Sequence, residues 1–119
     1  DNLQILPASL TADVAYPAIS AWLKNMDTPP EGIFAASDVI AMCALRAISE
    51  CGWSAPGDIH VVGYDDLVIA SQTAPPLTTI NQDLAQGAAH LVDLLFRRIA
   101  GEDTPSVIMP PKLVIRQSS

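Results

Sequence analysis

Residues Asp58–Asp66 read DIHVVGYDD, and this stretch decides the fold. It is a short apolar run that ends in Gly63, Tyr64 and two carboxylates. A buried parallel strand has this pattern when it delivers polar groups to the open end of a sheet. In open α/β sheets, small ligands bind in the crevice beyond the carboxyl ends of the strands. Asp65 is therefore the first candidate for a ligand contact.

The rest of the chain alternates short apolar runs with helical patterns, which predicts a parallel α/β sheet flanked by helices. Thr11, Ser37 and Asp83 are the expected starts of the helices, and Gln86 completes a capping-box-like pattern after Asp83. Pro17 falls inside the first helical pattern and predicts a later helix start or a kink. The expected strands are residues 3–6, 32–36, 59–64, 78–80, 107–109 and 113–115, and the expected helices are residues 12–26, 39–50 and 84–100.

Composition limits the possible functions. The 119 residues allow one domain at most. A net charge of −7, with only six basic residues, argues against nucleic-acid binding by this segment. No apolar run reaches the roughly 18 residues that a membrane span requires. The chain starts with Asp, so we expect a processed or truncated piece of a longer protein.

The two cysteines, Cys43 and Cys51, are expected on one helix. Eight residues of helix separate them by roughly 12 Å, which is beyond disulfide reach. Two free thiols point to a reducing cytoplasm. The alternative is that each cysteine serves only as a small buried apolar residue.

Polar residues follow two neighbouring strands. Asp65 and Asp66 are adjacent on a strand, face opposite sides, and so do not form a general acid/base pair. We assign Asp65 to a ligand hydroxyl or N–H and Asp66 to the start of the next helical turn; simple solvation of both is equally well supported. Ser37 and Asp38 open onto the same crevice, with Ser37 the expected contact and helix capping the simpler role for Asp38.

Signals for catalysis are weak. His60 and His90 have no Cys or carboxylate at metal-ligand spacing, and no Ser has a nucleophile-elbow context. The glycines form no phosphate-binding loop. The sequence therefore predicts no enzyme, no metal and no cofactor.

Three blocks of sequence, in register, resemble the LacI/GalR (lactose-repressor) family of bacterial transcription regulators. They are FAASDVIAMCALRAISECGWSAPGDI at Phe34–Ile59, HVVGYDD at His60–Asp66 and PPLTTINQD at Pro75–Asp83. The tail PPKLVIRQSS resembles the closing strand of the family and its basic residue. The resemblance covers nearly the whole chain and weakens before about Pro29.

The resemblance implies a partial periplasmic-binding-protein-like type I lobe. Residues 1–82 would form the C-terminal lobe of an effector domain, and residues 83–110 would supply a helix and strand that pack on the N-terminal lobe. It further implies a sugar-like effector, a cytoplasmic homodimer, and DNA binding only through a headpiece absent from this chain. The alternative is a periplasmic sugar-binding protein of a transport system, but the pairing of GYDD with PPLTTI favours the regulator.

The resemblance also assigns site residues. Asp65 matches the effector contact of the GYD motif, Ser37 stands where many members have Asn or Asp, and Gln82 lies at the crossover between lobes. Leu10 falls where members often have an aromatic residue that stacks on the ligand, and Leu cannot stack. The helix Val39–Cys51 and the segment Ala70–Pro75 resemble the dimer-forming surfaces of the family, and the apolar residues of the helix are expected in a core as readily as in the interface. The interface residues that the resemblance implies are Ile40, Cys43, Ala44, Ala70, Ala74 and Pro75.

Overall fold

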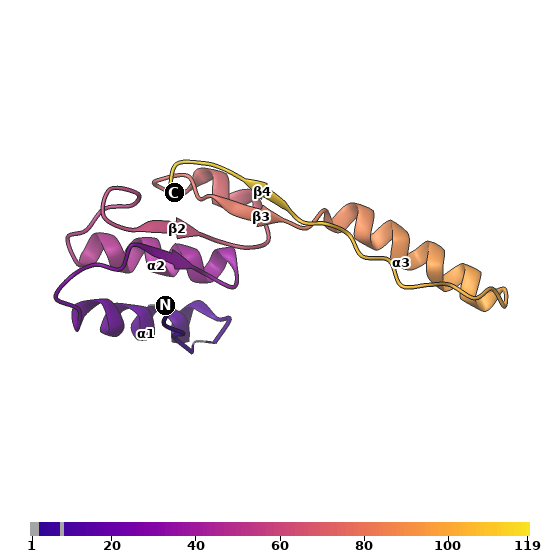
Figure 1. Cartoon of the computed structure of the whole chain (residues 1–119), viewed down its shortest axis with the longest axis horizontal. Helices are drawn as coiled ribbons and strands as arrows, with labels where there is room; N and C mark the ends of the chain where they lie inside the picture. The colour runs from indigo at the N-terminus through magenta and orange to yellow at the C-terminus, as the bar shows by residue number, and fades with distance from the viewer. Residues whose placement is uncertain (1–2, 8) are drawn as a thin grey trace.

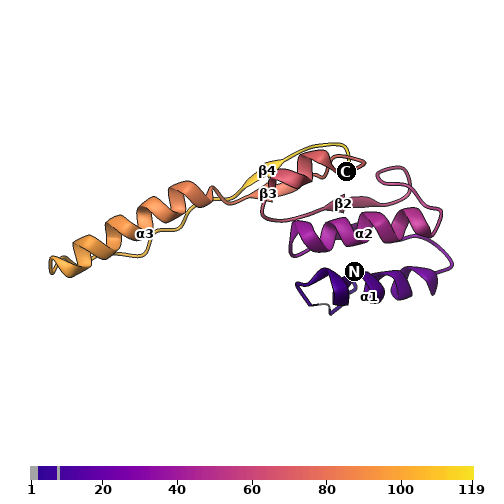
Figure 2. The same cartoon turned by 180° about the vertical axis from the view of Figure 1, so that it is seen from behind.

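The structure is a computed structural model that describes residues 3–7 and 9–119. It has an α/β body and a helical arm that projects from it, and the two views in Figures 1 and 2 agree on this arrangement. The elements in chain order are α1 (Ala12–Lys24), β1 (Gly32–Phe34), α2 (Asp38–Glu50), β2 (His60–Val62), the 3-10 helix η1 (Val68–Gln72), β3 (Thr79–Asn81), α3 (Leu84–Ile99) and β4 (Lys112–Val114). The predicted α/β class is confirmed.

Helix α1 begins directly after Thr11 and contains Pro17 in its second turn. The prediction of a later start is therefore wrong. Proline removes one backbone hydrogen bond, but its exposed position on the helix avoids a clash with the core. The opposite side of α1 packs on α2, where Ile19 and Leu23 are buried. The two helices form one layer beside the sheet (Figure 1).

Helix α2 is covered on most of its surface. Its N-cap is Ser37, whose Oγ accepts a hydrogen bond of 3.3 Å from the backbone N–H of Ile40. Gly52, with a φ of 81°, follows the helix in the left-handed conformation that glycine adopts without strain. The two cysteines are free, as expected. The buried apolar residues of α2 are Ile40, Ala41, Cys43, Ala44, Leu45, Ala47 and Ile48.

The parallel part of the sheet is short. Strands β1 and β2 pair in parallel with Phe34 opposite Val62, and a parallel bridge joins Val62 to Thr78. Strands β3 and β4 pair antiparallel, with Asn81 opposite Lys112. Val61 also donates its N–H to the Ser118 carbonyl at 2.7 Å, so the C-terminal segment closes the sheet beside β2.

Two predicted strands are absent. Residues 3–6 and 107–109 have no strand partner within the described part of the chain. A strand needs a neighbouring backbone to satisfy its N–H and C=O groups, and an apolar run alone does not supply one. The apolar pattern was therefore insufficient evidence in both places.

Helix α3 is the arm. Asp83 caps it by accepting a 3.1 Å hydrogen bond from the Gln86 N–H, as predicted, and Gly101 follows it with a φ of 84°. The helix buries none of its own residues. The structure consequently measures 60 × 30 × 25 Å, and strands β3 and β4 connect the body to the arm (Figure 2). None of the helices in the described ranges is long and apolar enough to cross a membrane.

Gly63 is predicted to be essential for packing at the end of β2. A Cβ on Gly63 would overlap the Asp38 carboxylate and would lie 3.0 Å from Leu77 Cδ2. We expect Gly63→Ala to lower the free energy of unfolding by about 1–3 kcal/mol, measured by urea denaturation. Gly32→Ala is the matched control, since its Cβ would meet nothing closer than 3.4 Å. Equal stability of the two variants would contradict the prediction.

Candidate functional site

The two strand-end loops meet at one edge of the sheet. After β2 the chain continues through Tyr64 to Asp65, and after β1 it continues to Ser37 and Asp38. The N–H of Asp38 donates to the Tyr64 carbonyl at 2.7 Å and joins these loops. Ser37 and Asp65 thus flank a bonded pair at the carboxyl edge, where α/β sheets bind small ligands.

Asp65 has an unusual backbone conformation and an incompletely used carboxylate. Its φ of 115° lies in a region that side chains other than glycine rarely adopt, at a typical cost of about 1–3 kcal/mol. Its N–H donates to the Ile80 carbonyl at 2.9 Å, and its Oδ1 accepts from Gln82 Nε2 at 3.2 Å. Oδ2 makes no hydrogen bond to the described residues. The structure therefore brings Asp65 and Gln82 together and leaves one oxygen free to accept.

Asp66 is held on both carboxylate oxygens. Oδ1 accepts from Arg116 Nη2 at 2.7 Å, and Oδ2 accepts from Asn81 Nδ2 at 2.9 Å. We call Asp66, Asn81 and Arg116 the Asp66 clamp. The Arg116 guanidinium, and then the Asn81 amide, hold the pKa of the Asp66 carboxyl below its usual value, against a smaller opposing effect of burial. Asp66 was expected to start the next helical turn, but Leu67 is the N-cap of η1 and the Asp66 side chain belongs to this clamp.

Asp38 joins three segments of the chain beneath the surface of the site. Its side chain is fully buried and accepts from the Leu67 N–H at 2.7 Å and from Thr79 Oγ1 at 2.5 Å. It also occupies the first turn of α2, where the helix dipole favours a negative charge. Helix capping, the simpler role expected for Asp38, belongs to Ser37 instead. The extended backbone of Ser37, with φ −156° and ψ 161°, is what an N-cap requires.

Sequence reasoning missed Thr79, Asn81 and Arg116 as parts of the site. A usable signal existed for the first two: residues i and i+2 of a strand share one face, so Thr79 and Asn81 of TTIN point the same way. For Arg116, only the resemblance of the tail drew attention to a basic residue. Its contact with Asp66, fifty positions earlier, has no local signal.

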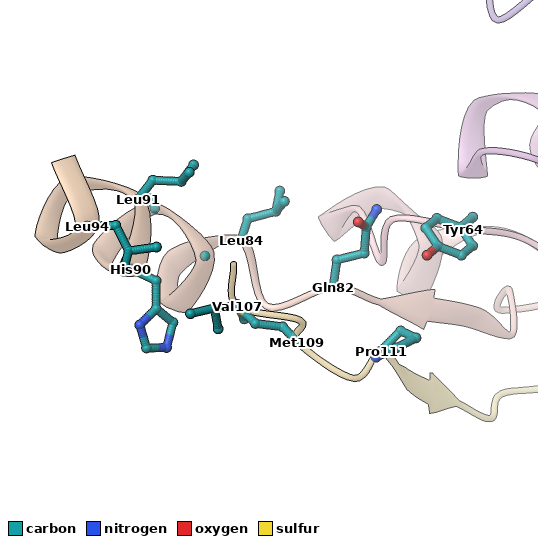
Figure 3. Close-up of a pocket in the computed structure, with 11 residues that line it drawn as sticks. Tyr64, Gln82, Leu84, His90, Leu91, Leu94, Val107, Met109 and Pro111 are labelled. Carbon is teal, nitrogen blue, oxygen red and sulfur yellow. The ribbon is translucent and has the colours of Figure 1, made fainter. Parts of the chain in front are cut away.

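Two of the predicted ligand contacts, Gln82 and Leu10, line different cavities. Tyr64 and Gln82 line a cavity of about 420 Å³, and the side chains of α3, including Leu91 and His90, line its other side (Figure 3). Leu10, 66% exposed, lines a larger groove of about 1160 Å³ between the N-terminal segment, α1 and β1. The structure does not bring Leu10 into one cavity with Gln82. The roles of Asp65, Gln82, Ser37 and Leu10 in ligand binding stay predictions.

Most of the predicted interface residues are covered within the single chain. Ile40, Cys43, Ala44 and Ala70 belong to its buried core and offer a partner little surface. Ala74 is exposed and Pro75 is half-buried, so these two retain surface for contact. Across the described ranges, no group of three His, Cys, Asp or Glu side chains could hold a metal ion.

This α/β fold, with polar loops at the carboxyl edge of its parallel strands, defines a class: the periplasmic-binding-protein-like domains. The chain belongs to the periplasmic binding protein-like domain family, whose profile matches residues 4–119. Its relatives confirm the resemblance to LacI-type transcription regulators.

Two curated regulators illustrate the similarity. The transcriptional repressor PurR of Pasteurella multocida is 43% identical over 94 residues, which are 77% of this chain and 28% of that protein. The regulator CelR of Thermobifida fusca is 36% identical over 84% of this chain and 31% of its own length. The chain therefore spans about a third of the length of these relatives.

Solved structures agree with the fold. A CelR–cellobiose complex matches with a TM-score of 0.84 and 33% identity, covering 94% of this chain and 35% of that one. A lac repressor dimer bound to operator and the anti-inducer ONPF matches with a TM-score of 0.88 and 33% identity, covering 94% and 39%. The extended arm is thus not peculiar to this chain, because the alignments span nearly all of it.

Asp38→Asn should destabilise the body. An amide of the same size places an NH₂ group where the carboxylate now accepts a hydrogen bond, so one buried donor loses its acceptor. We expect a loss of about 2–3 kcal/mol in the free energy of unfolding, measured by urea denaturation. Asp13→Asn is the matched control, because Asp13 is also in a first helical turn but is exposed. A loss below the control value would refute this role of Asp38.

The Asp66 clamp should make the free energy of unfolding fall as the pH falls in the acid range. Since the folded pKa of Asp66 lies below its unfolded value, its contribution is fully present above the unfolded pKa, near about 3.9, and is lost as pH falls through the folded pKa. Asp66→Asn should lower the free energy of unfolding at neutral pH. It should also reduce the fall of that free energy at acid pH (the acid limb), measured from about pH 7 to pH 2. Asp103→Asn, at a fully exposed ion pair, should leave the limb as in the wild type. An unchanged limb in Asp66→Asn would count against the clamp.

Proposed function

We propose that this chain is the effector-sensing and dimerising part of a bacterial transcription regulator of the LacI type. The observation that carries the proposal is Asp65: a carboxylate at the carboxyl edge of a parallel sheet, with one oxygen free to accept a hydrogen bond. The names of the relatives support regulation rather than transport. A cytoplasmic location belongs to the proposal and agrees with the two free thiols.

The effector is proposed to be a small polyhydroxylated molecule such as a sugar. Asp65 supplies an acceptor and Gln82 supplies both a donor and an acceptor, which suits hydroxyl groups. Ser37 would add a hydroxyl from the neighbouring strand end. Solved relatives carry cellobiose, lactose or ribose in their titles, which supports the same ligand class here.

The arm is proposed to pack on an N-terminal lobe supplied by the rest of the protein. Its apolar side chains are exposed, and an amphipathic helix gains stability by burying such a face. Residues 83–110 would then belong to that lobe, and residues 1–82 to the C-terminal lobe. The exposed apolar residues of the arm are Leu84, Leu91, Val92, Leu95, Phe96, Ile99, Val107 and Ile108.

Control of DNA binding would follow from lobe orientation. A ligand held between the lobes stabilises one orientation by binding it more tightly, and a homodimer transmits that orientation to a headpiece elsewhere in the protein. Coupling of this kind is typically about 1–3 kcal/mol. Ala74 and Pro75 are the proposed dimer contacts with surface available. The relatives are regulators, and we propose no catalytic role.

A periplasmic sugar-binding protein of a transport system is the alternative with the same fold. The two differ upstream of this segment: a helix-turn-helix identifies the regulator and a secretion signal identifies the transport component. The sequence of the complete gene is therefore the first test. A secretion signal directly before the ligand-binding domain would exclude the regulator.

Asp65→Ala in the complete protein should abolish the response to effector and leave operator binding intact, because the proposed role of Asp65 is to bond the ligand and DNA binding is assigned to a headpiece elsewhere in the protein. Titration calorimetry with cellobiose, lactose and ribose would measure affinity, which should fall by at least about tenfold for the sugar that binds. Asp27→Ala, on an exposed turn of the same lobe, is the control. Unchanged affinity in Asp65→Ala would remove Asp65 from the site.

A further inference from the structure

Two consecutive residues at the end of β2 have left-handed backbones. Asp65 has a φ of 115° and Asp66 has a φ of 53°, and neither is glycine. Conformations of this kind persist only where surrounding contacts over-determine them, and they cluster at binding sites. The contacts that hold this pair are therefore informative about how Asp65 is directed.

Most of those contacts fall on Asp66, whereas Asp65 has the bond of its N–H to the Ile80 carbonyl and the bond of its Oδ1 to Gln82. The Asp66 N–H lies 3.3 Å from Thr79 Oγ1, and its carboxylate takes both charged and neutral donors from the clamp. The ion pair with Arg116 is partly buried, with side chains 17% and 20% exposed, so solvent screens it less than a surface pair. Asp65 keeps one oxygen free. Asp66 is therefore held on both carboxylate oxygens, whereas Asp65 has one oxygen available to a ligand.

Arg116 is itself fixed at several points. Its Nη1 donates to the Leu77 carbonyl at 2.8 Å while Nη2 holds Asp66, so both ends of the planar fork are used. Its backbone N–H donates to Thr78 Oγ1 at 2.9 Å. A flexible side chain restrained in this way can impose a direction on the loop that it contacts.

The clamp lies where the arm joins the body. Asn81 is the last residue of β3, and Arg116 follows β4 by two residues. These two strands form the antiparallel connector that leads to α3 (Figure 1). Gln82, which donates to Asp65, is the first residue beyond β3. Rotation of the connector would therefore move the partners of both aspartates together.

We propose that Asp66 and Arg116 are positioning residues for Asp65: by tying the end of β2 to the connector, they set the direction of its carboxylate together with the orientation of α3. The inference rests on the proposed function, because it gives Asp65 a ligand to meet. A ligand that bonds Oδ2 of Asp65 shares that carboxylate with Gln82, which bonds Oδ1 at the base of the arm. Ligand binding and arm orientation are then coupled, and the coupling is reciprocal.

The test replaces Arg116 in the complete protein and measures amide hydrogen exchange at two positions. The Asp65 N–H, bonded to Ile80, reports on the strand-end loop, and the His60 N–H, bonded to Glu31 at 3.0 Å, reports on the β1–β2 ladder. Arg116→Gln should speed exchange at Asp65 by at least about tenfold and leave His60 unchanged. A general structural defect would speed exchange at both, and that result would overturn the proposal, as would no change at Asp65.

Matched variants sharpen the comparison. Arg97→Gln removes an arginine from an exposed ion pair with Glu102 and should leave both amides unchanged. Should Arg116→Gln fail to fold, Arg116→Lys keeps the charge and loses the fork, and should speed exchange at Asp65 alone to a smaller extent. In a double-mutant cycle, Asp66→Asn should add nothing to Arg116→Gln at the Asp65 amide, because the two residues act as one unit. Additive effects of the two substitutions on exchange at the Asp65 amide would contradict the proposal that Asp66 and Arg116 act together.

Sugar titrations separate this inference from the proposed function. If cellobiose, lactose or ribose binds the wild type, Arg116→Gln should lower the affinity for that sugar by about tenfold, and Arg97→Gln should leave the affinity unchanged. Equal affinities in these two variants would overturn the positioning role and leave the proposed function standing. If none of the three sugars binds but exchange at the Asp65 amide is faster in Arg116→Gln, the positioning role is supported and the proposal of a sugar effector is refuted.

Discussion

The buried carboxylate of Asp38 is the contact on which the rest of this structure depends. It lies in the first turn of α2 and accepts hydrogen bonds from Leu67, beyond β2, and from Thr79, at the start of β3. A buried charge is costly unless donors satisfy it, so these segments have to converge on it. Gly63 leaves the space that the carboxylate occupies. Three parts of the chain are thereby fixed around one side chain.

That convergence produces the site. With the end of β2 and the start of β3 held together, the chain that leaves β2 passes through Asp65 and Asp66 in left-handed conformations before it reaches η1. The loop holds the Asp66 carboxylate in the clamp and leaves Oδ2 of Asp65 without a hydrogen bond to the described residues. The same arrangement places Gln82 beside Asp65 at the base of the arm. Asp65, the end of the sheet and the connector are therefore joined by one network of hydrogen bonds, in which a change at one point reaches the others.

Prediction from sequence succeeded where the signal was local. The caps at Ser37 and Asp83, and the stop at Gly101, depend on a few neighbouring residues and were all located correctly. The carboxyl-edge position of Asp65 also followed from one strand and its polar end. Prediction failed for residues 3–6 and 107–109, since a strand needs a partner that an apolar run does not specify. It also failed for Pro17, where the exposed position of the ring lets the helix continue.

The sequence by itself determined the α/β class, the periods and ends of the helices, and the resemblance that links GYDD and PPLTTI to one family. These features are encoded in short-range patterns of apolarity, capping and turn chemistry. Only the tertiary structure decided that Asp38 is buried, that Asp66 is held on both carboxylate oxygens, and that Asp65 leaves one oxygen without a hydrogen bond to the described residues. That assignment depends on donors from Leu67, Asn81 and Arg116, which lie far from their partners along the chain. Long-range contacts of this kind leave no periodic signal in the sequence, so folding has to bring the partners together before their roles can be read.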